Sequence, residues 1–157
     1  MNTKSLRSAH IIFDLNGVLF EKKQILAQMV YASLPQSIEI LKECAQFHNQ
    51  DSEPLHTLYV LSNASTLSLS LLQKKFPEVF AVFHEIHISS VVGLSKPDPQ
   101  FFIYFLKKHA VEASHCIFID DALPNVEAAQ SVGMQGILFT DPEHLRSALQ
   151  ALHALPS

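Results

Sequence analysis

Three short apolar runs along the chain each stop at a polar residue. Continuous runs of β-branched, aromatic and aliphatic residues of this length predict strands that are buried on both faces, as in a parallel sheet. Weaker apolar stretches at 86–88 and 137–139 predict two further strands. The main runs, each with the polar residues that follow it, are 10–13 with Asp14, 58–61 with Ser62, and 116–119 with Asp120 and Asp121.

Segments of helical periodicity separate these strands. Asp98 and Pro99 form a typical helix start, with a capping side chain followed by proline, and Gly133 is a typical stop. The alternation of strands and helices predicts an α/β fold with a doubly wound, Rossmann-like parallel sheet in three layers. The predicted helices cover 36–47, 64–75, 99–109, 124–132 and 142–153.

Composition and charge restrict the class of protein. The chain has 157 residues, of which 48% are hydrophobic, and a net charge of -4. It is too apolar to be disordered, and its length predicts a single domain over 1–157, because domains run to about 100–200 residues. Eleven basic residues against fifteen acidic ones argue against a nucleic-acid partner, and no apolar run approaches the ~20 residues of a membrane span. A cytoplasmic protein is expected.

Several groups with chemical potential follow the predicted strands. Ligands of open α/β sheets bind beyond the carboxyl ends of the strands, so Asp14, Ser62, Asp120 and Asp121 are expected to meet at one edge. Lys96, in a loop with prolines on its carboxyl side, would join them. Clustered carboxylates repel one another unless a cation intervenes, and Mg²⁺ prefers oxygen ligands. Carboxylates, a hydroxyl, a lysine and Mg²⁺ together are what phosphoryl transfer requires.

Four segments at these positions resemble the motifs of the haloacid dehalogenase-like (HAD) hydrolases. They occur in the order that the family shows, and the similarity extends over residues 10–139, nearly the whole chain. The resemblance implies a phosphatase-type hydrolase on the fold predicted above. The segments are Phe13-Asp14-Leu15-Asn16-Gly17-Val18-Leu19, Leu61-Ser62-Asn63, Ser95-Lys96-Pro97-Asp98-Pro99 and Ile119-Asp120-Asp121-Ala122-Leu123-Pro124-Asn125.

The resemblance implies a role for each position. Asp14 would be the nucleophile that forms an aspartyl-phosphate, a covalent route that splits one difficult step into two. Ser62 and the backbone near Asn63 would bind the phosphoryl oxygens, and Lys96 would contact both Asp14 and the phosphoryl group. Asn125 would support the loop of the fourth motif. The implied ligands of Mg²⁺ are Asp14, Asp121, Asp120 and the backbone carbonyl of Asn16.

The first motif departs from the family pattern at Asn16. Phosphatases of this family usually carry a second aspartate here, which protonates the leaving group and then activates water. An amide can orient a leaving oxygen but has no proton to exchange, and general acid–base catalysis contributes about 10²–10⁴-fold. We therefore predict intact Mg²⁺ binding and weakened turnover, most of all for poor leaving groups.

Two other functions remain open. The substitution at Asn16 favours a pseudoenzyme, in which the fold is retained as a binding module. Retention of Asp14, Ser62, Lys96 and Asp121 argues against that reading. A dehalogenase is the second alternative, but that branch usually has tyrosine in place of Asn16 and works without metal.

The segment between the first motif and the second is too short for a separate cap domain. Residues 20–34 supply one amphipathic helix, with Ile25, Leu26, Met29 and Val30 on its apolar face. The site should therefore be open, and its partner either a small phosphorylated substrate or a larger phosphorylated molecule. The apolar face at 25–34 is a candidate homodimer surface, although packing on the core is the favoured reading.

The nine histidines invite a second metal site. His84 and His87 are of particular interest, because they fall near a predicted strand. A spacing of three residues places their side chains on opposite faces of that strand, so no histidine is assigned to a site.

Overall fold

The central sheet carries five strands, all parallel, in the order β5-β4-β1-β6-β7. The computed structural model describes residues 6–26, 28–49 and 51–157. Each of the five predicted strands is present, which confirms the prediction of an α/β fold with a doubly wound parallel sheet. The strands are β1 (Ala9–Phe13), β4 (His56–Ser62), β5 (Glu85–Ile88), β6 (Cys116–Asp120) and β7 (Gln135–Leu138).

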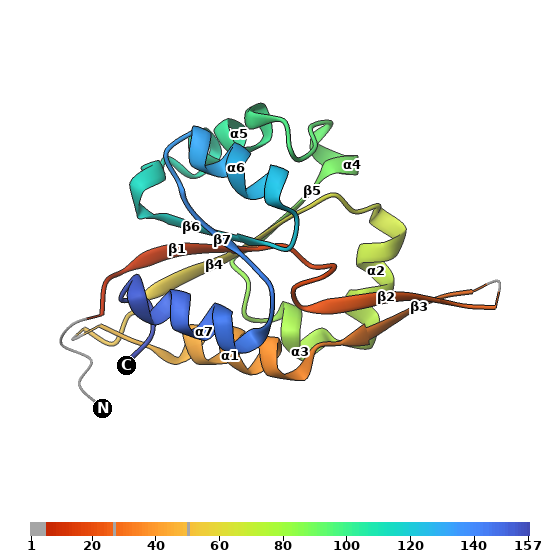
Figure 1. Cartoon of the computed structure of the whole chain (residues 1–157), viewed down its shortest axis with the longest axis horizontal. Coiled ribbons are helices and arrows are strands. Elements are labelled where there is room, and N and C mark those ends of the chain that lie inside the picture. Colours follow the sequence, from red (N-terminus) through yellow and green to blue (C-terminus); the bar gives the residue numbers. More distant parts are fainter. Residues whose placement is uncertain (1–5, 27, 50) are drawn as a thin grey trace.

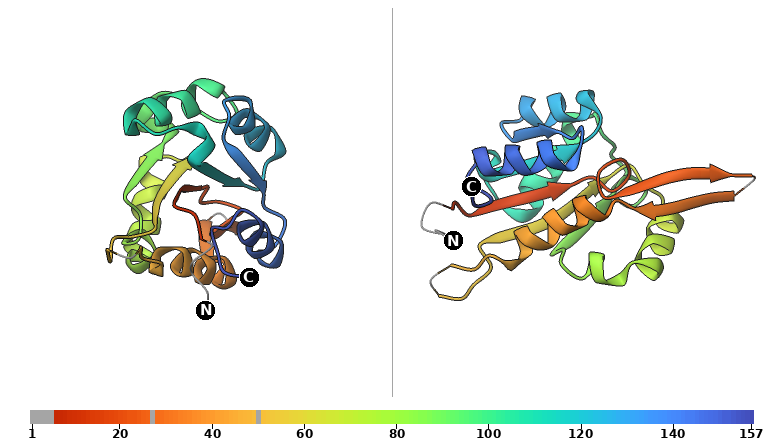
Figure 2. Two further views of the ribbon diagram at one scale, coloured as in Figure 1. Left: turned by 90° about the vertical axis from the view of Figure 1, so that its left-hand side faces the viewer. Right: turned by 60° about the horizontal axis from the view of Figure 1, so that its bottom comes forward.

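Helices cover both faces of this sheet, so the protein has three layers (Figures 1 and 2). One face carries α4 (Ser89–Val92), α5 (Pro99–His109) and α6 (Leu123–Ser131). Among the helices of the described residues, none is long and apolar enough to cross a membrane. The opposite face carries α1 (Pro35–Gln46), α2 (Thr66–Lys75), α3 (Pro77–Phe80) and α7 (Pro142–Ala151).

The strands are apolar on both sides because each face of the sheet has its own core. Successive side chains of β1 alternate between the two: Ile11 and Phe13 belong to the core under α1 and α7, and Ile12 to the core under α5 and α6. All three side chains are fully buried. A strand that is buried on both faces has a continuous apolar sequence rather than an alternating one, and for this reason β1 could be predicted from the sequence.

The topology brings the polar ends of three strands together. Strand β1 lies at the centre and pairs with β4 on one side and β6 on the other. Because these pairings are parallel, Asp14, Ser62 and Asp120 all lie at the carboxyl edge of the sheet. This edge, next to the point where the order of the strands reverses, is where ligands of open α/β sheets bind.

Residues 20–25 and 28–33 form two paired antiparallel strands, so the prediction of a helix over 20–34 is wrong. Strand β2 (Phe20–Ile25) pairs antiparallel with β3 (Gln28–Ser33), and the hairpin projects away from the sheet (Figure 1). Phe20 and Tyr31 are buried at its base, whereas the side chain of Leu26 is 93% exposed and its φ of +57° is left-handed. A helix needs a core under its apolar stripe, and the projecting end of this segment has none.

Candidate active site

Asp14 is the first residue after β1 and is buried at the carboxyl edge of the sheet. Its backbone N–H donates to the carbonyl of Ile119 at 2.9 Å, which extends the pairing of β1 with β6 by one residue. Its Oδ1 accepts a hydrogen bond of 2.7 Å from the N–H of Leu15. Both contacts hold the carboxylate in a fixed orientation, as a nucleophile requires.

Lys96 links two of the three clustered aspartates. Its ammonium Nζ lies 2.6 Å from Oδ2 of Asp120 and 3.1 Å from Oδ1 of Asp14. The lysine side chain is only 1% exposed, so the ion pairs are screened little by water. Three residues that the sequence predicted for the site, each from a different loop, therefore meet at one ammonium group.

Asn63 holds the loop that carries Lys96. Its side-chain Nδ2 donates to the carbonyl of Lys96 at 2.8 Å, and its Oδ1 accepts from the N–H of Lys96 at 2.9 Å. We predicted that the backbone near Asn63 binds the phosphoryl oxygens; the side chain of Asn63 has a separate task, which is to position the lysine loop. The buried Ser62 lies at the end of β4, and its hydroxyl favours the ionised form of Asp14, which lowers the pKa of that carboxyl group.

The two adjacent aspartates after β6 have different surroundings. Asp120 is fully buried, and both of its oxygens are hydrogen-bonded. Oδ1 accepts from the N–H of Ala122 at 2.8 Å, while Oδ2 accepts from Lys96 at 2.6 Å and from Nδ2 of Asn125 at 3.0 Å. Asp120 therefore positions Lys96 and the fourth loop, whereas Asp121 is exposed.

Gly17 leaves the space that the carboxylate of Asp121 occupies. A Cβ at this position would lie 2.1 Å from Oδ2 of Asp121, and Gly17 has a φ of +87°, which side chains other than glycine rarely adopt. The glycine thus allows the fourth loop to approach the first. The sequence places Gly17 in the first motif but assigns it no role, because the side chain that needs the space belongs to the distant fourth motif.

The acidic cluster fits a divalent metal. Asp14, Asp120 and Asp121 each offer a carboxylate oxygen, and these atoms lie within 4.8 Å of one another. The amide Oδ1 of Asn16 is buried and, among the described residues, accepts no hydrogen bond. A set made of oxygen donors suits Mg²⁺, and the lack of a side chain at Gly17 lets the carboxylate of Asp121 approach the first loop.

Burial raises the pKa of Asp14, because a charged carboxylate is poorly solvated at this position. The ammonium of Lys96 opposes that shift, and the neighbouring charge of Asp120 adds to it. Burial also raises the pKa of Asp121, again with a contribution from Asp120. A cation among these groups would oppose both upward pKa shifts, since it favours the ionised forms of Asp14 and Asp121.

Comparison with known proteins identifies a family of hydrolases. A family model described as haloacid dehalogenase-like hydrolase matches residues 27–133. The drimenol cyclase drtB of Aspergillus calidoustus is 33% identical over 100 residues, which are 64% of this chain and 19% of that protein. The sesquiterpene phosphatase astK of Aspergillus oryzae is 37% identical over 84 residues, which are 54% of this chain and 42% of that protein. The chain spans less than half the length of either relative.

A solved structure shares the fold. A HAD family enzyme of Bacteroides thetaiotaomicron, crystallised in complex with magnesium and inorganic phosphate, aligns with a TM-score of 0.70 at 16% identity. The alignment covers 87% of this chain and 98% of that one. At this level of identity the likeness establishes the architecture, and the chemistry has to be argued from the side chains described above.

Proposed function

Because this chain belongs to the haloacid dehalogenase-like hydrolase family, we propose that it hydrolyses phosphate monoesters with Asp14 as the nucleophile. One observation carries the proposal: the carboxylate of Asp14 lies 3.1 Å from the ammonium of Lys96 and shares a possible metal site with Asp121. A nucleophile, a buried cation and an oxygen-donor cluster at the carboxyl edge of the sheet are the requirements of phosphoryl transfer. The similarity to a sesquiterpene phosphatase supports the same reaction class.

In the first step, a carboxylate oxygen of Asp14 attacks phosphorus and forms an acyl phosphate, while the bond from phosphorus to the ester oxygen breaks. Lys96 stabilises the charge on the phosphoryl oxygens and keeps Asp14 ionised. The hydroxyl of Ser62 donates a hydrogen bond to a phosphoryl oxygen of the bound substrate. The departing alkoxide takes a proton from water, because Asn16 has no acidic proton to give.

In the second step, water attacks phosphorus and the bond between phosphorus and Asp14 breaks. Inorganic phosphate leaves, and the carboxylate of Asp14 is regenerated. No carboxylate at position 16 takes the proton of the attacking water, so this proton passes to solvent or to the phosphate. Both proton transfers are therefore slower than in a relative with aspartate in place of Asn16.

Mg²⁺ is the cofactor that this donor set would hold. We assign Asp14, Asp121 and the backbone carbonyl of Asn16 as its ligands, because both oxygens of Asp120 already accept hydrogen bonds. When bound, the ion supplies positive charge to the phosphoryl oxygens. The positive charges of the ion and of Lys96 would then balance the negative charges of the carboxylates and of the phosphoryl group.

The test compares p-nitrophenyl phosphate with an alkyl phosphate such as glycerol phosphate, in the presence of Mg²⁺. Asp14→Asn should abolish phosphate release from both substrates. Asn16→Asp should raise kcat on the alkyl phosphate by up to about 10²–10⁴-fold and on the aryl phosphate by much less, because p-nitrophenolate leaves without a proton. If Asn16→Asp is no faster on the alkyl ester, the role assigned to Asn16 is wrong.

A pseudoenzyme is the second candidate, and the amide of Asn16 is the observation in its favour. The two functions differ in whether Asp14 can accept a phosphoryl group. Beryllium fluoride with Mg²⁺ forms an acyl-phosphate mimic on a reactive aspartate, detectable by ¹⁹F NMR. An adduct in this protein that is absent from Asp14→Asn would support the hydrolase, and no adduct would support the binding module.

A further inference from the structure

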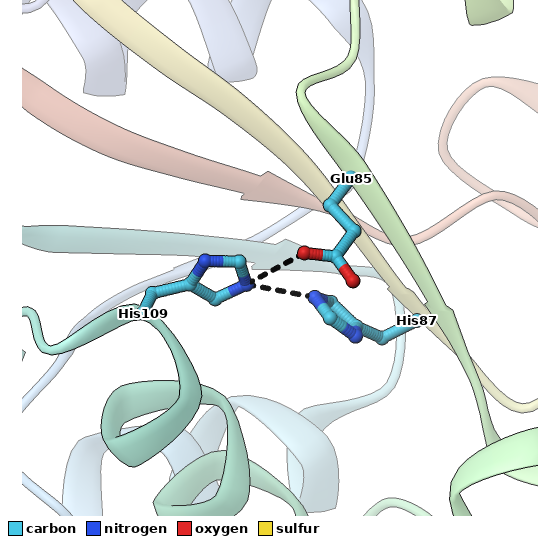
Figure 3. A group of neighbouring side chains, drawn as sticks. All are labelled: Glu85, His87 and His109. Carbon is cyan, nitrogen blue, oxygen red and sulfur yellow. Dashed lines mark hydrogen bonds and ion pairs between the residues drawn. The ribbon is translucent and has the colours of Figure 1, made fainter.

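Two histidines and a glutamate meet on the side of the sheet that α5 covers (Figure 3). Glu85 and His87 lie two residues apart on the edge strand β5, and His109 is the last residue of α5. We propose that Glu85, His87 and His109 bind a Zn²⁺ ion, which ties the edge strand to the end of this helix. Strand β4 separates this cluster from β1 and its nucleophile.

The separations of the ligand atoms suit zinc. Nε2 of His87 lies 2.9 Å from Nε2 of His109, and the same atom of His109 lies 3.7 Å from Oε2 of Glu85. All three ligand atoms fall within 4.8 Å of one another. Zinc bonds of about 2.0–2.2 Å in tetrahedral geometry place neighbouring ligand atoms about 3.3–3.6 Å apart. Shifts of a few tenths of an ångström would bring His109 to this separation from both of its partners, and the remaining pair, Glu85 and His87, lies within the 4.8 Å limit of the cluster.

The local structure explains how this cluster arises. Residues two apart on a strand point to the same face, so Glu85 and His87 lie side by side while the side chain of Ile86 points the other way. His84 is exposed and is not one of the proposed ligands. The sequence pattern drew attention to His84, which precedes the strand, and to His87 within it, whereas Glu85 between them was not considered. The sequence pattern also had no means of placing the end of α5 beside β5.

The protonation of the histidines favours a metal. Zinc binds neutral imidazole, and burial lowers the pKa of His87 to about 4. Burial also lowers the pKa of His109, with Glu85 opposing that shift. Both rings are therefore neutral at physiological pH and available as ligands. The partly exposed carboxylate of Glu85 offers a path for the ion and leaves a fourth coordination position to water.

The competing explanation is a hydrogen-bonded histidine pair among aromatic rings. The His87 ring packs edge-on against Tyr104 and Phe105, and His109 lies 4.5 Å from Tyr59 between ring centroids. The ammonium of Lys108 also forms an ion pair with Oε1 of Glu85, and its positive charge opposes a metal. A pair without metal needs no carboxylate beside it, whereas the proposed site uses Oε2 of Glu85.

Zinc titration of the full chain tests the proposal. Metal is removed first, and Zn²⁺ is then titrated against a chromophoric chelator in excess Mg²⁺, which occupies the acidic cluster and competes poorly for imidazole. The wild type should bind one equivalent. His109→Gln and Glu85→Gln should each weaken binding by at least the ~10–100-fold that loss of an outer-shell partner costs. Lys108→Met should tighten it, because a competing cation is removed.

Two comparisons keep the result interpretable. His144→Gln alters an exposed histidine outside the cluster and should bind zinc as the wild type does. Bound Zn²⁺ should also raise the Tm of the wild type but not that of His109→Gln, which shows that the ion bridges folded elements. The proposal fails if His109→Gln and Glu85→Gln retain wild-type affinity. It also fails if the bound zinc is lost in Asp121→Ala, since the ion would then belong to the acidic cluster.

Discussion

Replacing Lys96 by methionine should remove the only charge that lies between two buried carboxylates within the described part of the chain. Methionine keeps much of the length and apolar character of lysine, so the substitution isolates the loss of the ammonium group. In the wild type this group lies 2.6 Å from Asp120 and 3.1 Å from Asp14, both of which are buried. Removing one partner of a buried ion pair costs about 3–5 kcal/mol of stability. We expect a loss in that range at neutral pH without Mg²⁺.

The loss should depend on pH, with a sign that follows from Asp14. Burial already raises the pKa of this carboxyl group, and without the lowering influence of Lys96 it rises further. The folded variant then keeps a proton that the unfolded chain loses above its ordinary pKa of about 3.9. Stability of the variant therefore falls as pH rises from about 4 toward neutrality, and its difference from the wild type is smallest in acid.

Urea unfolding followed by far-UV circular dichroism measures this, since the chain has no tryptophan. Lys107→Met is the control, because this lysine is exposed and a surface change should stay within about 0.5 kcal/mol. Mg²⁺ should restore part of the stability that Lys96→Met loses. A loss below about 1 kcal/mol at neutral pH, or one that does not vary with pH, would contradict an ion pair shared by the two aspartates.

Other substitutions have matched controls within the chain. Gly17→Ala should weaken the Mg²⁺ dependence of phosphate release, since the new Cβ would meet Asp121, whereas Gly93→Ala shares a positive φ but has open space and should leave it unchanged. Asn63→Ala removes two hydrogen bonds to Lys96 and should cost about 2 kcal/mol and lower kcat. Asn49→Ala, which removes two solvent-exposed bonds in a distant loop, should cost less stability and leave kcat intact.

The strands were predictable because the information that specifies them is local. In the run before Asp14, every position is apolar or partly so, and both faces of β1 are covered in the structure. The helix over Pro99–His109 was equally clear, since its Asp98 cap accepts a hydrogen bond of 2.9 Å from the N–H of Gln100. Parallel pairing then follows from the alternation of these elements, which gathers the polar strand ends at one edge.

The hairpin at 20–34 was missed because its pattern suits two structures. Apolar residues at Ile25, Leu26, Met29 and Val30 have helical spacing, but helical spacing stabilises a helix only where a core covers the stripe. Here the ends of the segment are held by buried Phe20 and Tyr31, and the intervening residues satisfy their backbone bonds across the hairpin. Only the positions of these two anchors in the core decide between the alternatives.

The sequence by itself determined the fold class, the order of the elements and which residues reach the carboxyl edge of the sheet. It could not decide which of Asp120 and Asp121 holds Lys96 and which is free to bind the metal, because the two are chemically identical and adjacent. The tertiary structure decides this: Lys96 and Asn125 approach one carboxylate and enclose it, and Gly17 makes room for the other. Local periodicity sets the direction of a side chain, whereas its partners come from distant segments that only packing brings within hydrogen-bond distance.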